Sequence, residues 1–244
     1  MGWLPSLQEK GASIHSQGGQ DGFLKEILSH VGAGTRTCIE FGYNSTGSNT
    51  ACLAEQGWTR ILFDKDNENL SIGLHRETLT PSNISEVFYR HGVPQEPGYL
   101  SIDVDSVDLW LLKALLDDGL RPRIVSSEYN CNFPLEVSAT VLPSARWKGG
   151  DAVYGASLLA LWRVAIAHGY VLVCVAPRMD LFFVRANLLG GEEPLPLEAF
   201  RQFTGIRFHH VPLRRRDRLF VEYPSLEPLE NLPWRPCAEA GKAV

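Results

Sequence analysis

Hydrophobic and polar positions alternate with two different periods along the first 187 residues of the chain. From Gln20 to Val31, apolar side chains recur on one face of a helix, at Phe23, Leu24, Ile27, Leu28 and Val31. Short apolar runs bounded by glycine or by acidic residues lie between such segments and indicate strands. The whole pattern predicts helices over residues 20–31, 51–54, 68–74, 82–91, 108–116 and 154–168, and strands over residues 37–41, 60–63, 77–79, 99–102, 123–127, 171–175 and 181–184.

This alternation of strands and helices predicts an α/β fold with a mostly parallel sheet covered on both faces. The last two predicted strands are joined by residues 176–180 alone, which are too few for a helical crossover, so we expect an antiparallel hairpin. After Asn187 the chain becomes rich in proline. We expect two parts: a domain of residues 1–187, and a C-terminal extension of residues 188–244 that packs on it and ends in a frayed segment.

Composition and charge narrow the class of protein. The 244 residues are 44% hydrophobic and 21% charged, which is ordinary for a globular chain that needs no disulfide or structural metal to fold. The net charge of −5 predicts neither a nucleic-acid nor a membrane partner, and we interpret the basic run Arg214–Arg218 as a solvated or salt-bridged loop. The five cysteines show no zinc-binding spacing, and no signal-peptide pattern or bilayer-length apolar run is evident, which favours a cytoplasmic protein.

Polar side chains follow the predicted strands at the edge where parallel sheets bind ligands. They are found at Glu40–Gly42, Asp64, Asp103–Asp105 and Glu128–Asn130. A glycine at position 42 allows backbone to pass close to a ligand, and an acidic side chain 24 residues after Glu40 suits the two hydroxyls of a ribose. Taken singly, the glycine is also explained as a simple turn and the aspartate as a helix cap. The ordered set favours a binding site.

These segments resemble a known enzyme superfamily when they are read in order. SQGGQDGFLKEIL, CIEFGYNSTGSNTACLAEQGW, ILFDKDNEN, LSIDVDSVDLW and SSEYNCNFP are similar to the S-adenosylmethionine-dependent methyltransferases, and within them to the FkbM-like relatives. The resemblance covers residues 13–187. It implies a Rossmann-like class I methyltransferase sheet of seven strands, with S-adenosylmethionine as cofactor.

The resemblance assigns cofactor contacts to particular residues. Glu40 and Gly42 would lie against the methionine part, where Asn44 replaces the family's usual second glycine. Asp64 would hold the ribose, and Asn83 would flank the adenine. Asp103 would lie beside the methyl group, and the opening motif would place two further residues near the cofactor, Gln17 and Asp21.

The expected acceptor is a small molecule, methylated on oxygen. The candidate catalytic bases are the strand-end carboxylates Asp103, Asp105 and Glu128. The candidate acceptor contacts are Asp105, Tyr129, Asn130, Trp147 and Tyr154. The three carboxylates with Asn130 offer oxygen ligands of the kind that Mg²⁺ takes, but we favour a site without metal.

A second class of function is consistent with the same residues. Asn44 in the first motif and the C-terminal extension without a counterpart in the family suggest a catalytically inactive methyltransferase-like module that serves as a binding or partner subunit. The oligomeric state is not predicted by any feature of the sequence.

Overall fold

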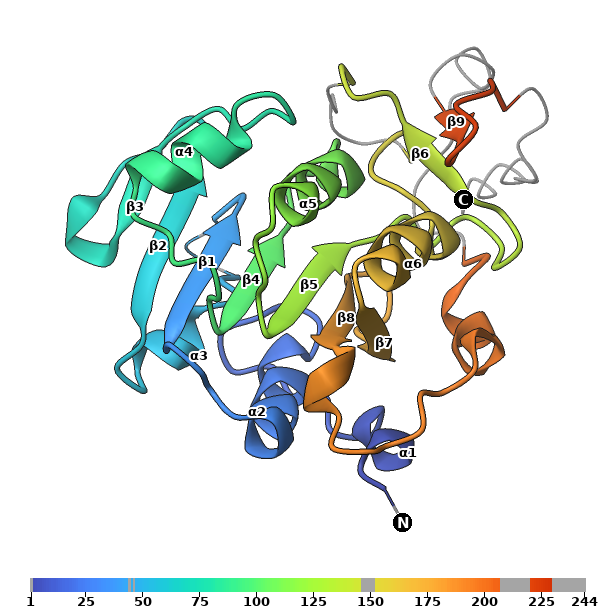
Figure 1. Cartoon of the computed structure of the whole chain (residues 1–244), viewed down its shortest axis with the longest axis horizontal. Coiled ribbons are helices and arrows are strands. Elements are labelled where there is room, and N and C mark those ends of the chain that lie inside the picture. Colours follow the sequence, from blue (N-terminus) through green and yellow to red (C-terminus); the bar gives the residue numbers. More distant parts are fainter. Residues whose placement is uncertain (1, 44, 46, 146–151, 207–219, 230–244) are drawn as a thin grey trace, which may run out of the picture.

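One twisted sheet of seven strands organises the computed structural model, which describes residues 2–43, 45, 47–145, 152–206 and 220–229 (Figure 1). The strand order is β3-β2-β1-β4-β5-β8-β7. Only β8 runs antiparallel to its neighbours, β5 and β7, so the predicted α/β class and the antiparallel hairpin are confirmed. The strands are β1 (Thr37–Phe41), β2 (Thr59–Asp64), β3 (Leu74–Arg76), β4 (Tyr99–Ile102), β5 (Ile124–Glu128), β7 (Tyr170–Val175) and β8 (Asp180–Arg185).

Helices cover both faces of this sheet (Figure 1). On one face lie α4 (Ile84–Arg90), α5 (Asp108–Asp117) and α6 (Leu158–Ala167). On the other lie α1 (Leu4–Leu7), α2 (Gln20–Val31) and α3 (Ala51–Ala54). Three 3-10 turns complete the helical elements, at η1 (Leu70–Ile72), η2 (Ala186–Leu188) and η3 (Leu197–Phe203). No helix in the described part of the chain is long and apolar enough to cross a membrane.

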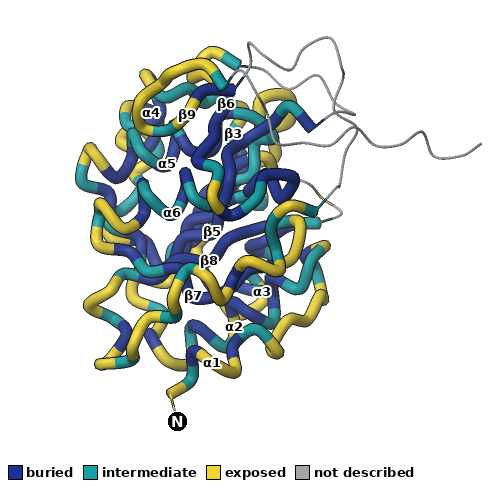
Figure 2. Tube along the Cα trace, turned by 90° about the vertical axis from the view of Figure 1, so that its right-hand side faces the viewer, coloured by how far each residue is buried: buried dark blue, intermediate teal, exposed yellow. Residues whose placement is uncertain are grey.

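The core consists of two apolar layers, one on each face of the sheet (Figure 2). Side chains of a strand point alternately to the two faces, so Ile39 and Phe41 of β1 pack with α4 and α5, whereas Cys38 packs with α2. Because both faces are covered, the strands carry nearly continuous apolar runs. The thiols of Cys38 and Cys174 are buried and free.

The chain around β3 differs from the sequence prediction. The only helical element within residues 68–74 is the 3-10 turn η1, in which the Asn69 side-chain Oδ1 accepts the Ser71 amide and Gly73 adopts a left-handed conformation with φ 77°. The strand therefore begins at Leu74, which pairs with Leu62, and it ends before residues 77–79, where the prediction placed it. Similarly, α6 begins after Ser157, whose hydroxyl accepts the Ala160 amide, and not at residue 154.

A small second sheet was not predicted. β6 (Ala139–Val141) pairs antiparallel with β9 (Phe220–Glu222) of the C-terminal extension. The Phe220 ring packs edge-on against Phe133 at 5.0 Å, and the Tyr223 carbonyl accepts hydrogen bonds from Ser138 Oγ and Arg163 Nη1 at 2.7 Å each. These contacts anchor the described part of the extension on the face that carries α5 and α6 (Figure 1).

Phe220 is 1% exposed, so we expect Phe220→Ala to lower the free energy of unfolding by about 3–5 kcal/mol, through lost burial and the cavity left behind. Ile166→Ala, on the exposed side of α6, should change it by less than about 0.5 kcal/mol. Urea denaturation of both variants measures the difference. Equal effects of the two substitutions would show that β9 does not stabilise the fold.

Candidate functional site

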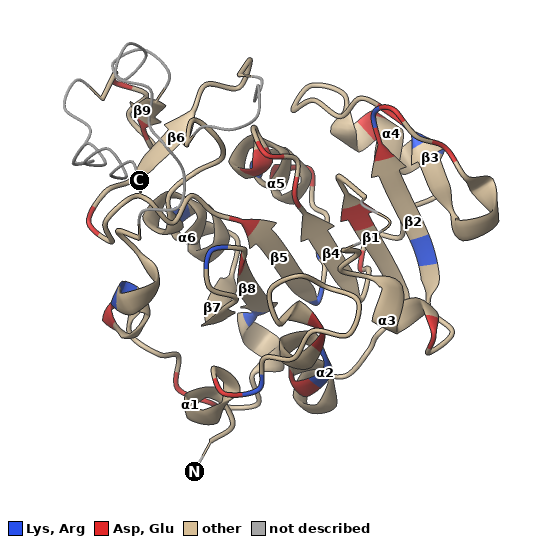
Figure 3. Cartoon of the chain, turned by 180° about the vertical axis from the view of Figure 1, so that it is seen from behind, with Lys and Arg blue, Asp and Glu red and all other residues tan. Residues whose placement is uncertain are grey.

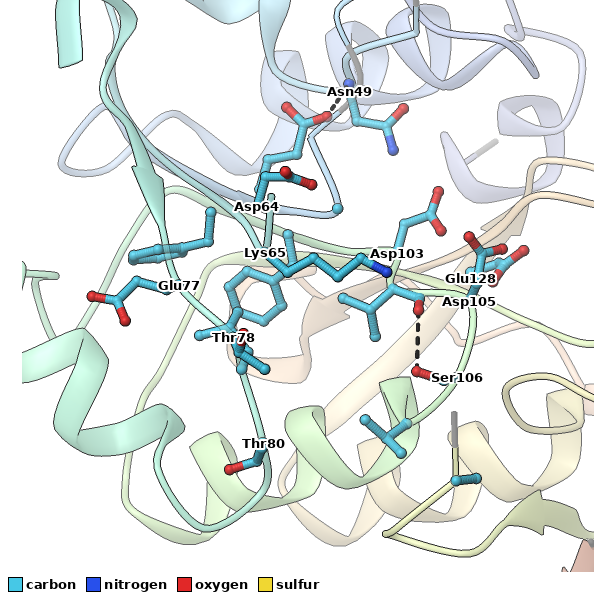
Figure 4. A pocket seen from close by; sticks show the side chains of 18 of the residues that line it. Asn49, Asp64, Lys65, Glu77, Thr78, Thr80, Asp103, Asp105, Ser106 and Glu128 are labelled. Carbon is cyan, nitrogen blue, oxygen red and sulfur yellow. Dashed lines mark hydrogen bonds between the residues drawn. The ribbon is translucent and has the colours of Figure 1, made fainter. Parts of the chain in front are cut away.

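A cavity of about 740 Å³ runs along the carboxyl ends of the parallel strands (Figure 4). Its wall is formed by residues that end or follow β1, β2, β3, β4 and β5, by the loop after β6 and by the turn between β7 and β8. Cofactor and substrate sites commonly have this size, and they commonly occupy this edge of an α/β sheet. The predicted strand-end residues Glu40, Gly42, Asp64, Asp103 and Glu128 all line it.

Gly42 follows β1, where its backbone lies against the backbone of Asp103 after β4. Its φ is 69°, and a Cβ at this position would lie 2.9 Å from the carbonyl carbon of Asp103 and overlap its oxygen. The Gly42 amide donates to the Phe63 carbonyl at 3.1 Å, which fixes the turn against β2. Glycine is therefore required here by the protein's own backbone, in addition to any ligand.

Glu40 ties the first turn to the start of α3. Its carboxylate, 3% exposed, accepts hydrogen bonds from the Asn49 amide at 2.9 Å, from Ser48 Oγ at 2.8 Å and from Thr50 Oγ1 at 2.5 Å. Burial raises the pKa of Glu40, while these hydrogen bonds and the Arg60 guanidinium act in the opposite direction. Glu40 therefore lines the cavity and also holds the turn of residues 48–50 in place.

Two residues of the opening motif, Gln17 and Asp21, have different roles at the cavity. Gln17 lines the cavity and packs against Gly47. Asp21 is buried beside the wall, and its Oδ2 accepts the amides of Ile14, His15 and Ser16 at 2.7–2.9 Å. Burial opposes ionisation, but these hydrogen bonds prevail and lower the pKa of Asp21. We conclude that Asp21 orders the loop that presents Gln17.

Asp64 closes β2 at the cavity, with one of its two carboxylate oxygens occupied. Oδ1 accepts the amides of Asp66 at 2.9 Å and Asn67 at 2.6 Å, and the Asn67 side-chain amide at 2.8 Å. Within the described residues no hydrogen bond reaches Oδ2. A carboxylate held in this way leaves one oriented oxygen for the hydroxyl groups of a ligand.

Asn83 lies behind the wall and not on it. Its side chain caps the turn before α4, accepting the Thr80 amide at 2.8 Å and donating to the Thr78 carbonyl at 2.9 Å. The wall here consists of residues 77–81, which sequence reasoning missed because it placed the third strand too late. Glu77 is held by the Arg90 guanidinium at 2.7 Å and His91 Nε2 at 2.8 Å, and the bond from His91 is the main cause of its lowered pKa.

Three carboxylates meet at the other end of the cavity. Oxygens of Asp103, Asp105 and Glu128 lie within 4.8 Å of one another, and their side chains gather at one place in Figure 4. Asp105 adopts a left-handed conformation with φ 55°. Asp108, fully buried, holds this loop by accepting the amides of Val104 at 2.8 Å and Ser106 at 3.0 Å. The loop geometry therefore depends on Asp108, which no sequence motif indicated.

Burial and mutual repulsion dominate the electrostatics of this carboxylate cluster. Burial raises the pKa of Asp103 and of Glu128 well above their ordinary values, and the neighbouring carboxylates raise both further. Burial also raises the pKa of Asp108 and of Asp180 to about 7. Asp180 opens β8 opposite Glu128 and accepts Gln20 Nε2 at 3.0 Å. Figure 3 shows acidic residues at the tips of β1 and β5.

The remaining predicted acceptor contacts lie behind the described part of the wall. Tyr129 is buried, and its hydroxyl donates to the Phe203 carbonyl at 2.8 Å. Asn130 is fully buried, and its amide donates to the carbonyls of Ala152 at 2.8 Å and Tyr154 at 2.9 Å. The structure thus brings together three members of the alternative magnesium set and directs Asn130 elsewhere. Tyr154 is buried too, 2% exposed, whereas Trp147, Asn44 and Arg214–Arg218 lie outside the described residues.

Fold and site together define an α/β protein with a cavity at the carboxyl edge of a mostly parallel sheet. No protein-family model matches the chain, and no curated protein matches it either. The residues of the cavity and their geometry therefore carry the functional assignment.

Gly42→Ala tests the approach of β1 to β4. We expect it to lower the free energy of unfolding by about 1–3 kcal/mol more than Gly57→Ala, because only the Cβ at position 42 meets other backbone. Gly57 has the similar φ of 77° with nothing within 4 Å, so it controls for the left-handed conformation alone. Chemical denaturation measures both, and equal losses would refute the steric constraint.

The raised pKa of Asp180 predicts that this carboxyl group stabilises the folded state more at acidic pH than at neutral pH. A carboxyl group with a folded pKa of about 7 stabilises the fold fully below its unfolded pKa of 3.8, and that contribution is lost as the pH rises through 7. Asp180→Asn removes this group but keeps an acceptor for Gln20. We expect the variant to show a weaker decline of the unfolding free energy between about pH 4 and pH 7 than the native protein. An unchanged slope in urea titrations would exclude Asp180 as its source.

Proposed function

We propose that the protein is an S-adenosylmethionine-dependent methyltransferase that methylates an oxygen atom of a small-molecule acceptor. One observation carries this proposal: a single cavity is lined by Glu40, Gly42, Asp64 and Asp103. These are the residues to which the resemblance assigns the cofactor, from its methionine part to its ribose. The strand order with an antiparallel β8 is the one expected of a class I methyltransferase sheet, and it supports the same proposal.

The cavity offers a distinct surface to each part of the cofactor. Gln17 and the Gly42 turn would face the methionine part, and the open oxygen of Asp64 would accept the ribose hydroxyls. Residues 77–81 would enclose the adenine. The sulfonium would then point along the cavity toward Asp103.

The acceptor would enter at the carboxylate cluster, between the β4–α5 loop and residues 143–145. When bound, the cofactor would supply its methyl group to the acceptor oxygen, the C–S bonding pair would stay on sulfur, and the acceptor's hydroxyl proton would need a base. The cavity orients the two reactants, which supplies much of the rate. Glu128 and Asp103 have a raised pKa, so a carboxylate form of either is basic enough to take this proton.

Cofactor binding tests the proposal directly. Isothermal calorimetry with S-adenosylmethionine should detect binding to the native chain, and Asp64→Ala should weaken it about tenfold or more, because hydrogen bonds to a charged group contribute about 1.5–3 kcal/mol. Asp66→Ala, at the exposed neighbouring carboxylate outside the cavity, is the matched control and should bind as the native chain does.

Asp64→Asn separates the ribose contact from loop order. Its side-chain oxygen can still accept the amides of Asp66 and Asn67, while the second oxygen becomes a donor. Affinity should therefore fall without a change in the unfolding temperature of the ligand-free protein. No binding of the cofactor at millimolar concentration would refute the methyltransferase proposal altogether.

A further inference from the structure

Arg60 of β2 lies behind the cavity, against the turn that joins β1 to α3. The described residues of this β1–α3 turn are 42, 43, 45 and 47–50. The Arg60 guanidinium donates hydrogen bonds to Thr50 Oγ1 at 3.2 Å through Nε and to Ser48 Oγ at 3.3 Å through Nη2. Its Cζ also lies over the ring of Tyr43, 5.5 Å from the ring centroid. Arg60 therefore contacts both ends of the turn, although it is not one of the residues that line the cavity.

Two hydroxyl groups connect Arg60 to Glu40. A guanidinium has hydrogen-bond donors only, so the hydroxyls of Ser48 and Thr50 accept from Arg60. Each hydroxyl has a single hydrogen, and both hydrogens are donated to Glu40 Oε2, from Ser48 at 2.8 Å and from Thr50 at 2.5 Å. The result is an ion pair bridged by two hydroxyls. Its positive partner lies outside the cavity, and its negative partner lines it.

The beginning of the turn is also held by β2. The amides of Gly42 and Tyr43 donate to the Phe63 carbonyl at 3.1 and 3.4 Å. The Tyr43 ring beside these amides presents its negative face to the Arg60 guanidinium. Both ends of the turn are thus fixed to one strand, and the direction of the Glu40 carboxylate is fixed with them.

We propose that Arg60 is a positioning residue for the amino-acid part of S-adenosylmethionine, and that it acts from behind the cavity on the β1–α3 turn and on Glu40. This inference rests on the function proposed above and adds to it the residue that preorganises the methionine end of the site. A turn that is ordered before the ligand arrives does not have to be ordered during binding. Loss of Arg60 therefore weakens the binding of ligands that reach the turn, without removing any contact between Arg60 and the ligand.

Calorimetry with two neutral ligands separates positioning from a general loss of structure. S-adenosylhomocysteine, the demethylated product, reaches the turn with its amino-acid part, whereas 5′-methylthioadenosine has the same adenine, ribose and sulfur but lacks that part. Arg60→Lys keeps the charge but loses the planar fork that reaches both hydroxyls. We expect it to weaken S-adenosylhomocysteine binding about tenfold and 5′-methylthioadenosine binding less than about twofold.

Arg36→Lys is the matched control, because it makes the same exchange at an exposed position before β1 and outside the cavity. It should change the affinity for neither ligand. Equal weakening of both ligands by Arg60→Lys, or of neither, would overturn the inference.

Thr50→Val tests the hydroxyl bridge and serves as a second variant should Arg60→Lys fold poorly. It removes one bridging hydroxyl from a fully buried side chain and keeps its branched shape. We expect a smaller loss of affinity than with Arg60→Lys, with the same preference between the two ligands. Combined in one protein, the two substitutions should cost less than the product of their separate fold-changes, because they interrupt the same hydrogen-bond network. Independent, multiplicative losses would contradict the bridge.

Hydrogen exchange in the ligand-free protein separates this inference from the proposed function. The Asn49 amide donates to Glu40 Oε1 at 2.9 Å, so it should exchange faster in Arg60→Lys than in the native chain. Unchanged exchange of this amide, with both ligands bound normally, refutes the inference alone. No binding of either ligand to the native chain refutes the proposed function and, with it, the assignment of the turn to the cofactor.

Discussion

The contact between the backbone at Gly42 and the carbonyl of Asp103 sets the geometry on which the site depends. Two parallel strands end side by side there, with no side chain between them. Because the ends of β1 and β4 meet, Glu40 and Asp103 line one cavity, and the turn after β1 bonds to β2 and brings Asp64 to the same edge. A larger residue at position 42 would push the ends of β1 and β4 apart and move Glu40 away from Asp103.

Carboxylates serve two different purposes around this cavity. Asp21, Glu40 and Asp108 accept hydrogen bonds from backbone amides and hold loops in place. Each of these carboxylates therefore has its partners within the protein itself. Asp103 and Glu128 accept no such bonds from the described residues and remain directed at the cavity. Burying an unpaired carboxylate is costly, which is the reason to assign these two to a ligand and the first three to structure.

The sequence allowed most of the sheet to be predicted, because long apolar runs such as Tyr170–Val175 have few alternatives to a buried strand. It did not predict the strands of three residues. β3 depends on the cap at Asn69, and β6 depends on a partner about eighty residues later in the chain, which no local pattern indicates. Asp64, Asp103 and Glu128 follow or end strands and line the cavity, as their positions in the sequence predict. Asn130 does not line it, because its side-chain amide donates hydrogen bonds to buried carbonyl groups. Asp180 acts through a contact with the distant Gln20, and Asp108 accepts amides of its own loop that no sequence motif indicated.

The two sides of the cavity have different origins in the chain. One side is made of strand ends and the loops that follow them, where any change disturbs the sheet itself. The opposite side includes residues 143–145, which follow β6, the partner of β9, and do not belong to the main sheet. Loops of this kind tolerate insertions and replacements better than strand ends do. Changes confined to this loop can therefore alter what the cavity binds, while the side made of strand ends stays as it is.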